Sequence, residues 1–245
     1  MLENNVALVT GASRGIGRAI CVKFAEEGAT VLAGVRNPSL LDSYLDGIGG
    51  IKGKIIPVLI DVCDTASIKE CAMSIKKEFG HLDILVNNAG LTIIERFEMM
   101  KSESLQKIYD TNVFGLINVT QMMMRFLKKS ERPCIVNMAS IMADDSDIGQ
   151  SAYGSSKAAV VNLTKTWAKE YAGIGLRVNS ISPGNVDTDM FNIIEGKELQ
   201  DAIEKIGMKR VAKPEEIANV AFFLASDLAS YVTGENIRVN GGLIL

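Results

Sequence analysis

The strongest constraint on the fold of this chain is a regular alternation of short apolar runs with longer amphipathic stretches, from one end to the other. The apolar runs are rich in β-branched residues and nearly free of charge, which is typical of strands buried on both faces of a parallel sheet. These expected strands are residues 6–10, 30–33, 55–60, 84–87, 135–138, 177–181 and 237–239. The stretches with helical periodicity are residues 15–27, 65–79, 105–128, 152–171 and 214–225.

This order of elements predicts an α/β fold, a single Rossmann-type doubly wound parallel sheet flanked by helices on both faces. No Ser/Pro/Gly-rich tract, internal repeat or low-complexity segment divides the sequence, so residues 1–245 are expected to form one domain. Asp64 and Pro214 stand where two of the helices are expected to begin. Ligands of such sheets bind beyond the carboxyl ends of the strands, so the loops that follow strands are expected to carry the chemistry.

Composition excludes several other functions. The single histidine, His81, is the only imidazole on which a Ser-His-Asp hydrolase, a Cys-His protease or a metalloenzyme could be built. The four cysteines form no C-x-x-C pair, which argues against a zinc site and a disulfide framework. A net charge of −3 with both signs mixed along the chain argues against nucleic acid or a membrane surface as a partner. Neither a signal peptide nor a membrane span is recognisable, so a cytoplasmic protein with reduced thiols is expected.

A glycine-rich segment follows the first strand directly and opens a helix, with the spacing G-x-x-x-G-x-G. Glycines at this place let the backbone approach a pyrophosphate, which then meets the N–H groups and the positive dipole end of the helix. The alternative is a glycine-rich turn that binds nothing. The embedded G-x-S-x-G string also matches a nucleophile elbow, but His81 precedes a strand and so lies at the wrong edge of the sheet. The expected cofactor-binding residues here are Gly11, Ser13, Arg14, Gly15, Ile16 and Gly17.

The end of the second strand indicates which dinucleotide binds. An acidic residue there usually holds the 2′-hydroxyl of the adenosine ribose, whereas a 2′-phosphate needs cations. The sequence has no carboxylate at this place and has Arg36 instead, with Arg14 in the glycine-rich segment as a second guanidinium. Each arginine alone could be a solvated surface charge, but together they favour NADP(H) over NAD(H).

Tyr153 and Lys157 lie four residues apart at the start of an expected helix and therefore share one face. A tyrosine that exchanges a proton near pH 7 needs its pKa lowered by about 3 units from that of a free phenol. An ammonium about 4 Å away supplies roughly that much at an effective dielectric of about 20. Ser140 follows the fifth strand, where its hydroxyl could hydrogen-bond a carbonyl whose oxygen becomes negative during reduction.

In combination, these motifs resemble the short-chain dehydrogenase/reductase family along essentially the full length of the chain. The resemblance implies that Tyr153 is the general acid/base, that Lys157 lowers its pKa and holds the nicotinamide ribose, and that Ser140 orients the substrate carbonyl. It also implies that Asn112 supports a water relay behind Lys157. The motifs that carry it, in order, are residues 10–17, Asp61-Val62, residues 87–90, Asn112, Ser140, Tyr153 with Lys157, and Pro183-Gly184 followed by Val186 and Thr188.

The same resemblance implies further contacts with the cofactor. Asp61 and Val62 are expected at the adenine, and Val186 and Thr188 at the nicotinamide end. Asn88, Ala89 and Gly90 are expected to line the cleft between these ends.

Within the family, the first and last motifs are similar to those of bacterial 3-oxoacyl-acyl-carrier-protein reductases. Such reductases dock an acidic acyl carrier protein on basic residues beside the cleft, and the matching positions here are Glu131 and Ile174. Lys128, Lys129 and Arg132 are the basic residues that could replace them if the carrier protein is a partner.

Three further features bear on substrate and assembly. Asp144, Asp145 and Asp147 precede Tyr153 and form either a solvated turn or a means of selecting a polar or cationic keto substrate. The segment 190–206 stands where the family has its substrate lid, although core packing would also explain its apolar residues. By resemblance, the apolar C-terminal end and the helices near 105–128 and 152–171 build a homotetramer.

The leading hypothesis is therefore an NADPH-dependent ketoreductase that reduces a 3-oxoacyl thioester or similar ketone to the secondary alcohol, with Tyr153 as proton donor. The alternative in the same class is an NAD(P)-dependent alcohol dehydrogenase for a sugar, polyol or steroid. From a different class, a non-catalytic NADP-binding regulator stays open.

Overall fold

One parallel sheet organises the molecule. The computed structural model describes residues 1–40, 49–191 and 196–243. Seven strands pair in the order β3-β2-β1-β4-β5-β6-β7, and every neighbouring pair is parallel. This confirms the predicted fold class. The strands are β1 (Val6–Thr10), β2 (Thr30–Val35), β3 (Lys54–Leu59), β4 (Ile84–Asn87), β5 (Cys134–Met138), β6 (Arg177–Pro183) and β7 (Asn236–Val239).

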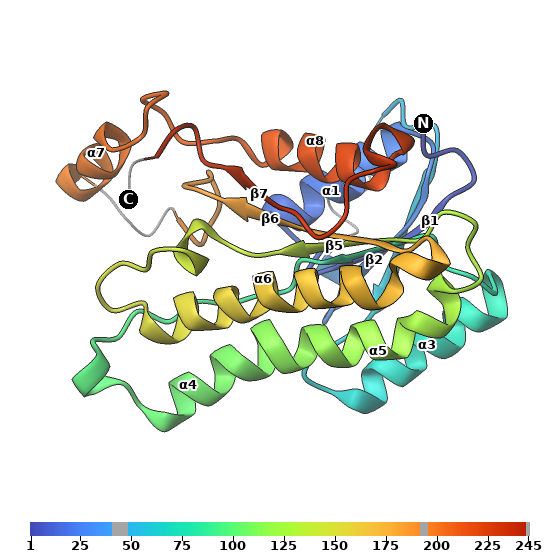
Figure 1. Ribbon diagram of the computed structural model, residues 1–245, viewed down its shortest axis with the longest axis horizontal. Helices are drawn as coiled ribbons and strands as arrows, with labels where there is room; N and C mark the ends of the chain where they lie inside the picture. Colours follow the sequence, from blue (N-terminus) through green and yellow to red (C-terminus); the bar gives the residue numbers. More distant parts are fainter. Residues whose placement is uncertain (41–48, 192–195, 244–245) are drawn as a thin grey trace.

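Helices cover both faces of the sheet (Figure 1), with α1 and α8 on one side and α3, α5 and α6 on the other. Alternate strand residues therefore belong to different cores: Val9 packs with α1 and α8, whereas Leu8 packs with α3 and α5. Within the described residues, no helix is long and apolar enough to cross a membrane. The α-helices are α1 (Gly15–Glu26), α3 (Thr65–Glu78), α4 (Ser102–Tyr109), α5 (Leu116–Leu127), α6 (Ser151–Tyr171), α7 (Gly196–Glu204) and α8 (Pro214–Ala225).

The helix start signals are found where the sequence places them. The side chain of Asp64 accepts a hydrogen bond from the amide of Ala66 at 2.9 Å, and Pro214 opens α8. The expected burial of all the strands is wrong for β3 and β7, where Lys54, Leu59 and Arg238 are exposed. These two strands form the edges of the sheet, so each lacks a neighbouring strand on one side.

The helix expected over 105–128 is interrupted. It begins earlier, as α4 at Ser102, and passes through a π-helix, Asp110–Gly115, before α5. A Cβ on Gly115 would lie 2.9 Å from both Cγ2 and the carbonyl oxygen of Val62, so the π-helix lies directly against the loop after β3.

The strand order reverses between β1 and β4, because the chain continues outward from β1 to β2 and β3 and then returns to β4 on the other side of β1. The crevice beyond the carboxyl ends of these two strands is where a doubly wound sheet binds its ligand. Part of the segment 190–206 borders this crevice, while residues 192–195 of that segment, and residues 244–245 of the apolar C-terminal end, lie outside the described residues.

Candidate active site

A cleft of about 1380 Å³ lies over the carboxyl ends of the strands. Residues far apart in the sequence meet in it, from the glycine-rich segment after β1 to the segment after β6. Of the site residues predicted from the sequence, Asn112 alone does not line it. Those that do are Gly11, Ser13, Arg14, Gly15, Ile16, Gly17, Arg36, Asp61, Val62, Asn88, Ala89, Gly90, Ser140, Tyr153, Lys157, Val186 and Thr188.

The glycine-rich segment is shaped by contacts that leave no room for side chains. Gly11 and Gly15 have φ of +67° and +53°, a region that favours glycine. A Cβ on Gly17 would lie 2.3 Å from the carbonyl oxygen of Gly11 and 2.5 Å from Nδ2 of Asn88. The same Nδ2 donates to the carbonyl oxygens of Thr10 and Gly11, at 3.0 Å each. The glycines thus let this segment pack against Asn88, and their backbone lines the cleft at the start of α1, where the pyrophosphate of a dinucleotide would meet helix N–H groups.

Residues suited to the adenosine end follow β2 and β3. Arg36 comes directly after β2 and is exposed. Two hydrogen bonds hold Asp61 in place. Its backbone amide donates to Oγ of Ser67 at 2.9 Å, and its side-chain Oδ1 accepts from the amide of Cys63 at 2.9 Å. The free thiol of Cys63 is exposed and also lines the cleft, a position that sequence analysis considered only for metal or disulfide chemistry.

The other predicted cation of this end, Arg14, points elsewhere. Its Nη1 lies 2.6 Å from Oδ2 of Asp189, in the segment after β6. Asp189 is not among the residues predicted from the sequence, although it directly follows Thr188 and lines the same cleft.

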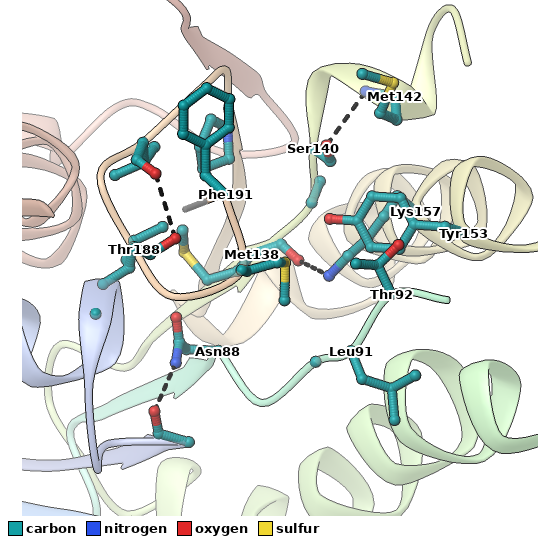
Figure 2. Close-up of a pocket in the computed structure, with 18 of the residues that line it drawn as sticks. Asn88, Leu91, Thr92, Met138, Ser140, Met142, Tyr153, Lys157, Thr188 and Phe191 are labelled. Atoms are coloured by element: carbon teal, nitrogen blue, oxygen red, sulfur yellow. Dashed lines mark hydrogen bonds between the residues drawn. The ribbon is translucent and has the colours of Figure 1, made fainter. Parts of the chain in front are cut away.

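Ser140, Tyr153 and Lys157 meet at the other end of the cleft (Figure 2). Tyr153 and Lys157 come from the first two turns of α6, and Ser140 lies two residues beyond β5. Nζ of Lys157 donates to the carbonyl oxygen of Met138 at 2.8 Å and lies 5.8 Å from the centroid of the Tyr153 ring. The side chain of Ser140 is near enough to the Tyr153 phenol for hydrogen bonding with it to lower the pKa of Tyr153 in part. A carbonyl oxygen placed here would therefore face a phenol and a hydroxyl together.

The pKa of Tyr153 differs from the sequence-based expectation. Burial raises this pKa above its ordinary value, and the hydrogen bond with Ser140 lowers it only in part. Lys157 does not contribute to this shift, because its own pKa of about 8 leaves it neutral at the pH where a phenol ionises. A raised pKa keeps the phenol protonated, which suits a proton donor.

Burial also lowers the pKa of Lys157, to about 8 from its ordinary value of 10.5. Between these two pH values the unfolded state binds more protons than the folded state, so the free energy of unfolding rises with pH across that window. Below pH 8 the full cost of burying the ammonium is present.

We expect Lys157→Met to raise the free energy of unfolding at pH 7 by about 2 kcal/mol, after allowing for the lost hydrogen bond to Met138. The gain over wild type should shrink steadily from pH 8 towards pH 10.5. Urea unfolding of both proteins at several pH values measures the difference. If Lys157→Met is less stable than wild type at pH 7, burial of the Lys157 ammonium does not have the cost proposed here.

Asn112 is buried within the π-helix and holds the neighbouring chain in place. Its Nδ2 donates to the Leu91 carbonyl and to Oγ of Ser156, both at 3.0 Å, and its Oδ1 accepts from the Leu91 amide at 2.9 Å. Both amide hydrogens are thus used. A role of Asn112 in a water relay, as implied by the family resemblance, would need its side-chain or main-chain carbonyl oxygen rather than its amide nitrogen.

The acidic residues before Tyr153 do not act as one group. Asp144 forms an ion pair with Arg238 of β7, with Oδ2 2.8 Å from Nη2. Asp145 and Asp147 line the cleft, and Oδ1 of Asp147 accepts from the amide of Ile148 at 2.7 Å. A polar contribution to substrate selection therefore rests on Asp145 and Asp147.

The basic residues considered for docking a carrier protein lie at the amino ends of the strands, on the side of this subunit opposite the cleft. Lys128, Lys129 and Arg132 stand between α5 and β5, before a strand, whereas the cleft lies beyond the strand ends. Nζ of Lys129 donates to the Gly80 carbonyl, and Arg132 forms an ion pair with Asp227, both partners also preceding strands. The expectation that these residues replace basic residues beside the cleft is wrong within one subunit, because a parallel sheet separates its two edges.

The cleft wall that includes Ser140 and Tyr153 carries apolar as well as polar side chains. Thr92 belongs to it and was missed by sequence analysis; its Oγ1 is buried and has no hydrogen-bond partner among the described residues. Phe191, from the start of the predicted lid segment, lines the same cleft (Figure 2). The apolar side chains of this wall are Leu91, Ile94, Ile141, Met142, Met190, Phe191 and Leu243.

In the part of the chain that the structure describes, no three His, Cys, Asp or Glu side chains gather as metal ligands would. His81 lies before β4, at the edge opposite the cleft, with Nε2 3.3 Å from Oδ2 of Asp83.

Comparisons with known proteins agree with this geometry. Residues 11–244 match a family model described as "Enoyl-(Acyl carrier protein) reductase". The 3-oxoacyl-[acyl-carrier-protein] reductase of Thermotoga maritima is 42% identical over 244 residues, covering 100% of this chain and 99% of the relative. That of Escherichia coli is 36% identical, covering 99% and 98%. A crystal structure of a short-chain type dehydrogenase/reductase from Mycobacterium marinum superposes with a TM-score of 0.92 at 34% identity, covering 99% of this chain and 96% of that one.

Proposed function

Because the chain belongs to the short-chain dehydrogenase/reductase family, and is thus an oxidoreductase of CH–OH and keto groups that uses a nicotinamide cofactor, we propose that it reduces 3-oxoacyl thioesters with NADPH. One observation carries this proposal. Ser140, Tyr153 and Lys157 line the same cleft as the glycine-rich segment after β1. The relatives at 36–42% identity, named as 3-oxoacyl-[acyl-carrier-protein] reductases, support the substrate class.

In the proposed reaction, Ser140 donates a hydrogen bond to the keto oxygen and Tyr153 transfers its phenolic proton to that oxygen. The bound nicotinamide supplies the hydride. Lys157 holds the nicotinamide ribose, and its position is set by its hydrogen bond to Met138. The apolar wall with Phe191 excludes water from the reacting carbonyl. The raised pKa of Tyr153 keeps the phenol in its protonated form, which a proton donor needs.

The cofactor preference is proposed from the charges at the adenosine end. Arg36 follows β2, where a carboxylate would select a ribose hydroxyl, and Arg14 is a second cation of the cleft, whose guanidinium pairs with Asp189 in this structure. Asp61 and Val62 would hold the adenine, and Val186 and Thr188 the nicotinamide end.

Residues 1–245 form one catalytic domain whose segment around 190–206 acts as the substrate lid. The subunits form a homotetramer, which the exposed apolar side chains of Leu105 and Phe114 in the α4 region support.

A second candidate activity is an NAD(P)-dependent alcohol dehydrogenase for a sugar, polyol or steroid. Asp145 and Asp147 at the substrate end favour it, because carboxylates beside a neutral acyl chain serve no recognition, whereas they hydrogen-bond hydroxyl groups. A non-catalytic NADP-binding regulator would not need Tyr153 and Ser140 in one cleft beside a buried Lys157.

A substrate screen with both cofactors separates these proposals. We expect oxidation of NADPH, followed at 340 nm, with acetoacetyl thioesters of N-acetylcysteamine, coenzyme A and acyl carrier protein. Turnover of polyols or steroids but not of thioesters would favour the second activity. Tight NADPH binding without turnover of any carbonyl would favour the regulator, and a strong preference for NADH would refute the argument from Arg14 and Arg36. Equal rates with all three thioesters would show that the carrier protein itself is not recognised.

A further inference from the structure

The ion pair between Arg14 and Asp189 joins two walls of the cofactor cleft. Arg14 belongs to the segment between β1 and α1, and Asp189 to the segment after β6. Their side chains meet at 2.6 Å, and both residues line the cleft. The guanidinium proposed to bind the ribose phosphate is therefore bound to a carboxylate in this structure.

The backbone keeps Asp189 close to the glycine-rich segment. The amide of Asp187 donates to the Ala212 carbonyl at 2.9 Å, and the amide of Ala212 donates to the Asn185 carbonyl at 2.9 Å. On the other side, Cγ2 of Thr188 lies 3.1 Å from the position of a Cβ on Gly15. Asp189 thus directly follows Thr188, which lies against Gly15 of the glycine-rich segment. The negative charge of Asp189 is therefore close to any phosphate that this segment binds.

We propose that Asp189 is a specificity-determining residue for the cofactor, because its carboxylate competes with the 2′-phosphate of NADPH for Arg14. This inference rests on the proposed role of Arg14 in binding that phosphate. The pair with Asp189 holds Nη1 of Arg14 and partly neutralises the charge that would attract a phosphate, so Asp189 and the phosphate compete for the same guanidinium. NADH has a hydroxyl at the same place, so its binding leaves the pair with Asp189 intact. Asp189 therefore lowers the preference for NADPH below what Arg14 and Arg36 would otherwise confer.

The effect should be moderate. The side chains of Arg14 and Asp189 are 75% and 66% exposed, and ion pairs at such exposure are weak. Removing the Asp189 carboxylate also removes its repulsion of the pyrophosphate, and this change affects NADPH and NADH equally. It therefore cancels in the ratio of the dissociation constants of NADH and NADPH, and a change in that ratio reports only the competition for Arg14.

The test is titration of the full chain with NADPH and with NADH, followed by the fluorescence of the reduced nicotinamide. We expect Asp189→Asn to raise the preference for NADPH over NADH about threefold, within the range of an exposed ion pair. Arg14→Gln should lower this preference, and in that background Asp189→Asn should leave it unchanged because there is no guanidinium left to compete for. The matched control is Asp145→Asn, which removes the same charge from another part of the cleft lining and should not alter the ratio.

Each other outcome overturns the inference. An unchanged ratio in Asp189→Asn shows that no competition exists, and an equal rise in Asp145→Asn shows a general effect of charge. If Arg14→Gln lowers the preference but Asp189→Asn does not raise it, only the inference fails. If Arg14→Gln leaves the preference unchanged, the proposed role of Arg14 fails with it.

Discussion

Tyr153→Phe should lower kcat for reduction of acetoacetyl thioesters by about 10²–10⁴-fold, the usual contribution of a positioned general acid. The phenol lines the cleft together with Ser140, and burial keeps it protonated. Phenylalanine keeps the ring and its packing, so NADPH affinity and thermal stability should stay close to those of wild type. Steady-state kinetics, a cofactor titration and a melting curve together measure these effects.

Tyr171→Phe is the matched control, since Tyr171 ends the same helix α6 and also packs in part against the core. It should keep wild-type kcat. Wild-type turnover by Tyr153→Phe would refute the proposed mechanism, whereas loss of turnover together with loss of cofactor affinity would show a structural role for the hydroxyl instead.

Gly17→Ala should weaken NADPH binding at least about tenfold and lower the free energy of unfolding by about 1–3 kcal/mol, the usual cost of overpacking. A Cβ at this position would lie 2.3 Å from the backbone oxygen of Gly11, closer than any tolerated contact. The segment after β1 and the start of α1 must then move apart, and the hydrogen bonds from Asn88 to Thr10 and Gly11 are strained with them. Urea unfolding and cofactor titration measure the two effects.

Gly173→Ala provides the control for this change. Gly173 lies in a short helical turn after α6, and a Cβ there meets nothing within 4 Å. Its replacement should alter the free energy of unfolding by less than about 1 kcal/mol and leave NADPH binding unchanged. If Gly17→Ala were as mild as this control, the close approach of Gly17 to the backbone oxygen of Gly11 would be refuted.

Local patterns account for the parts of the site that the sequence predicts well. The glycine spacing after β1 and the four-residue spacing of Tyr153 and Lys157 each lie within one turn and one helix, where geometry follows from the sequence directly. The separation of Asp144 from Asp145 and Asp147 was not predictable in this way, because the partner of Asp144 is Arg238, on β7 near the other end of the chain.

Electrostatic properties were the least predictable part. An ammonium four residues from a phenol suggests a lowered tyrosine pKa, yet the structure shows a raised one. The reason is burial, which depends on all the residues packed around α6 and not on those within it. The π-helix that contains Asn112 likewise depends on residues distant in the sequence, since its Gly115 fits against Val62 in the loop after β3.

The sequence by itself determined the class of fold, the phosphate-binding segment, the tyrosine and lysine of the catalytic end, and the family. Periodicity and short-range spacing specify these features before the chain folds. The tertiary structure alone decided that β3 and β7 are edges, that the basic residues near Arg132 lie away from the cleft, and that Arg14 is bound to Asp189. These outcomes depend on which distant residues meet and on how much water they exclude, and both are set only when the sheet and its helices pack together.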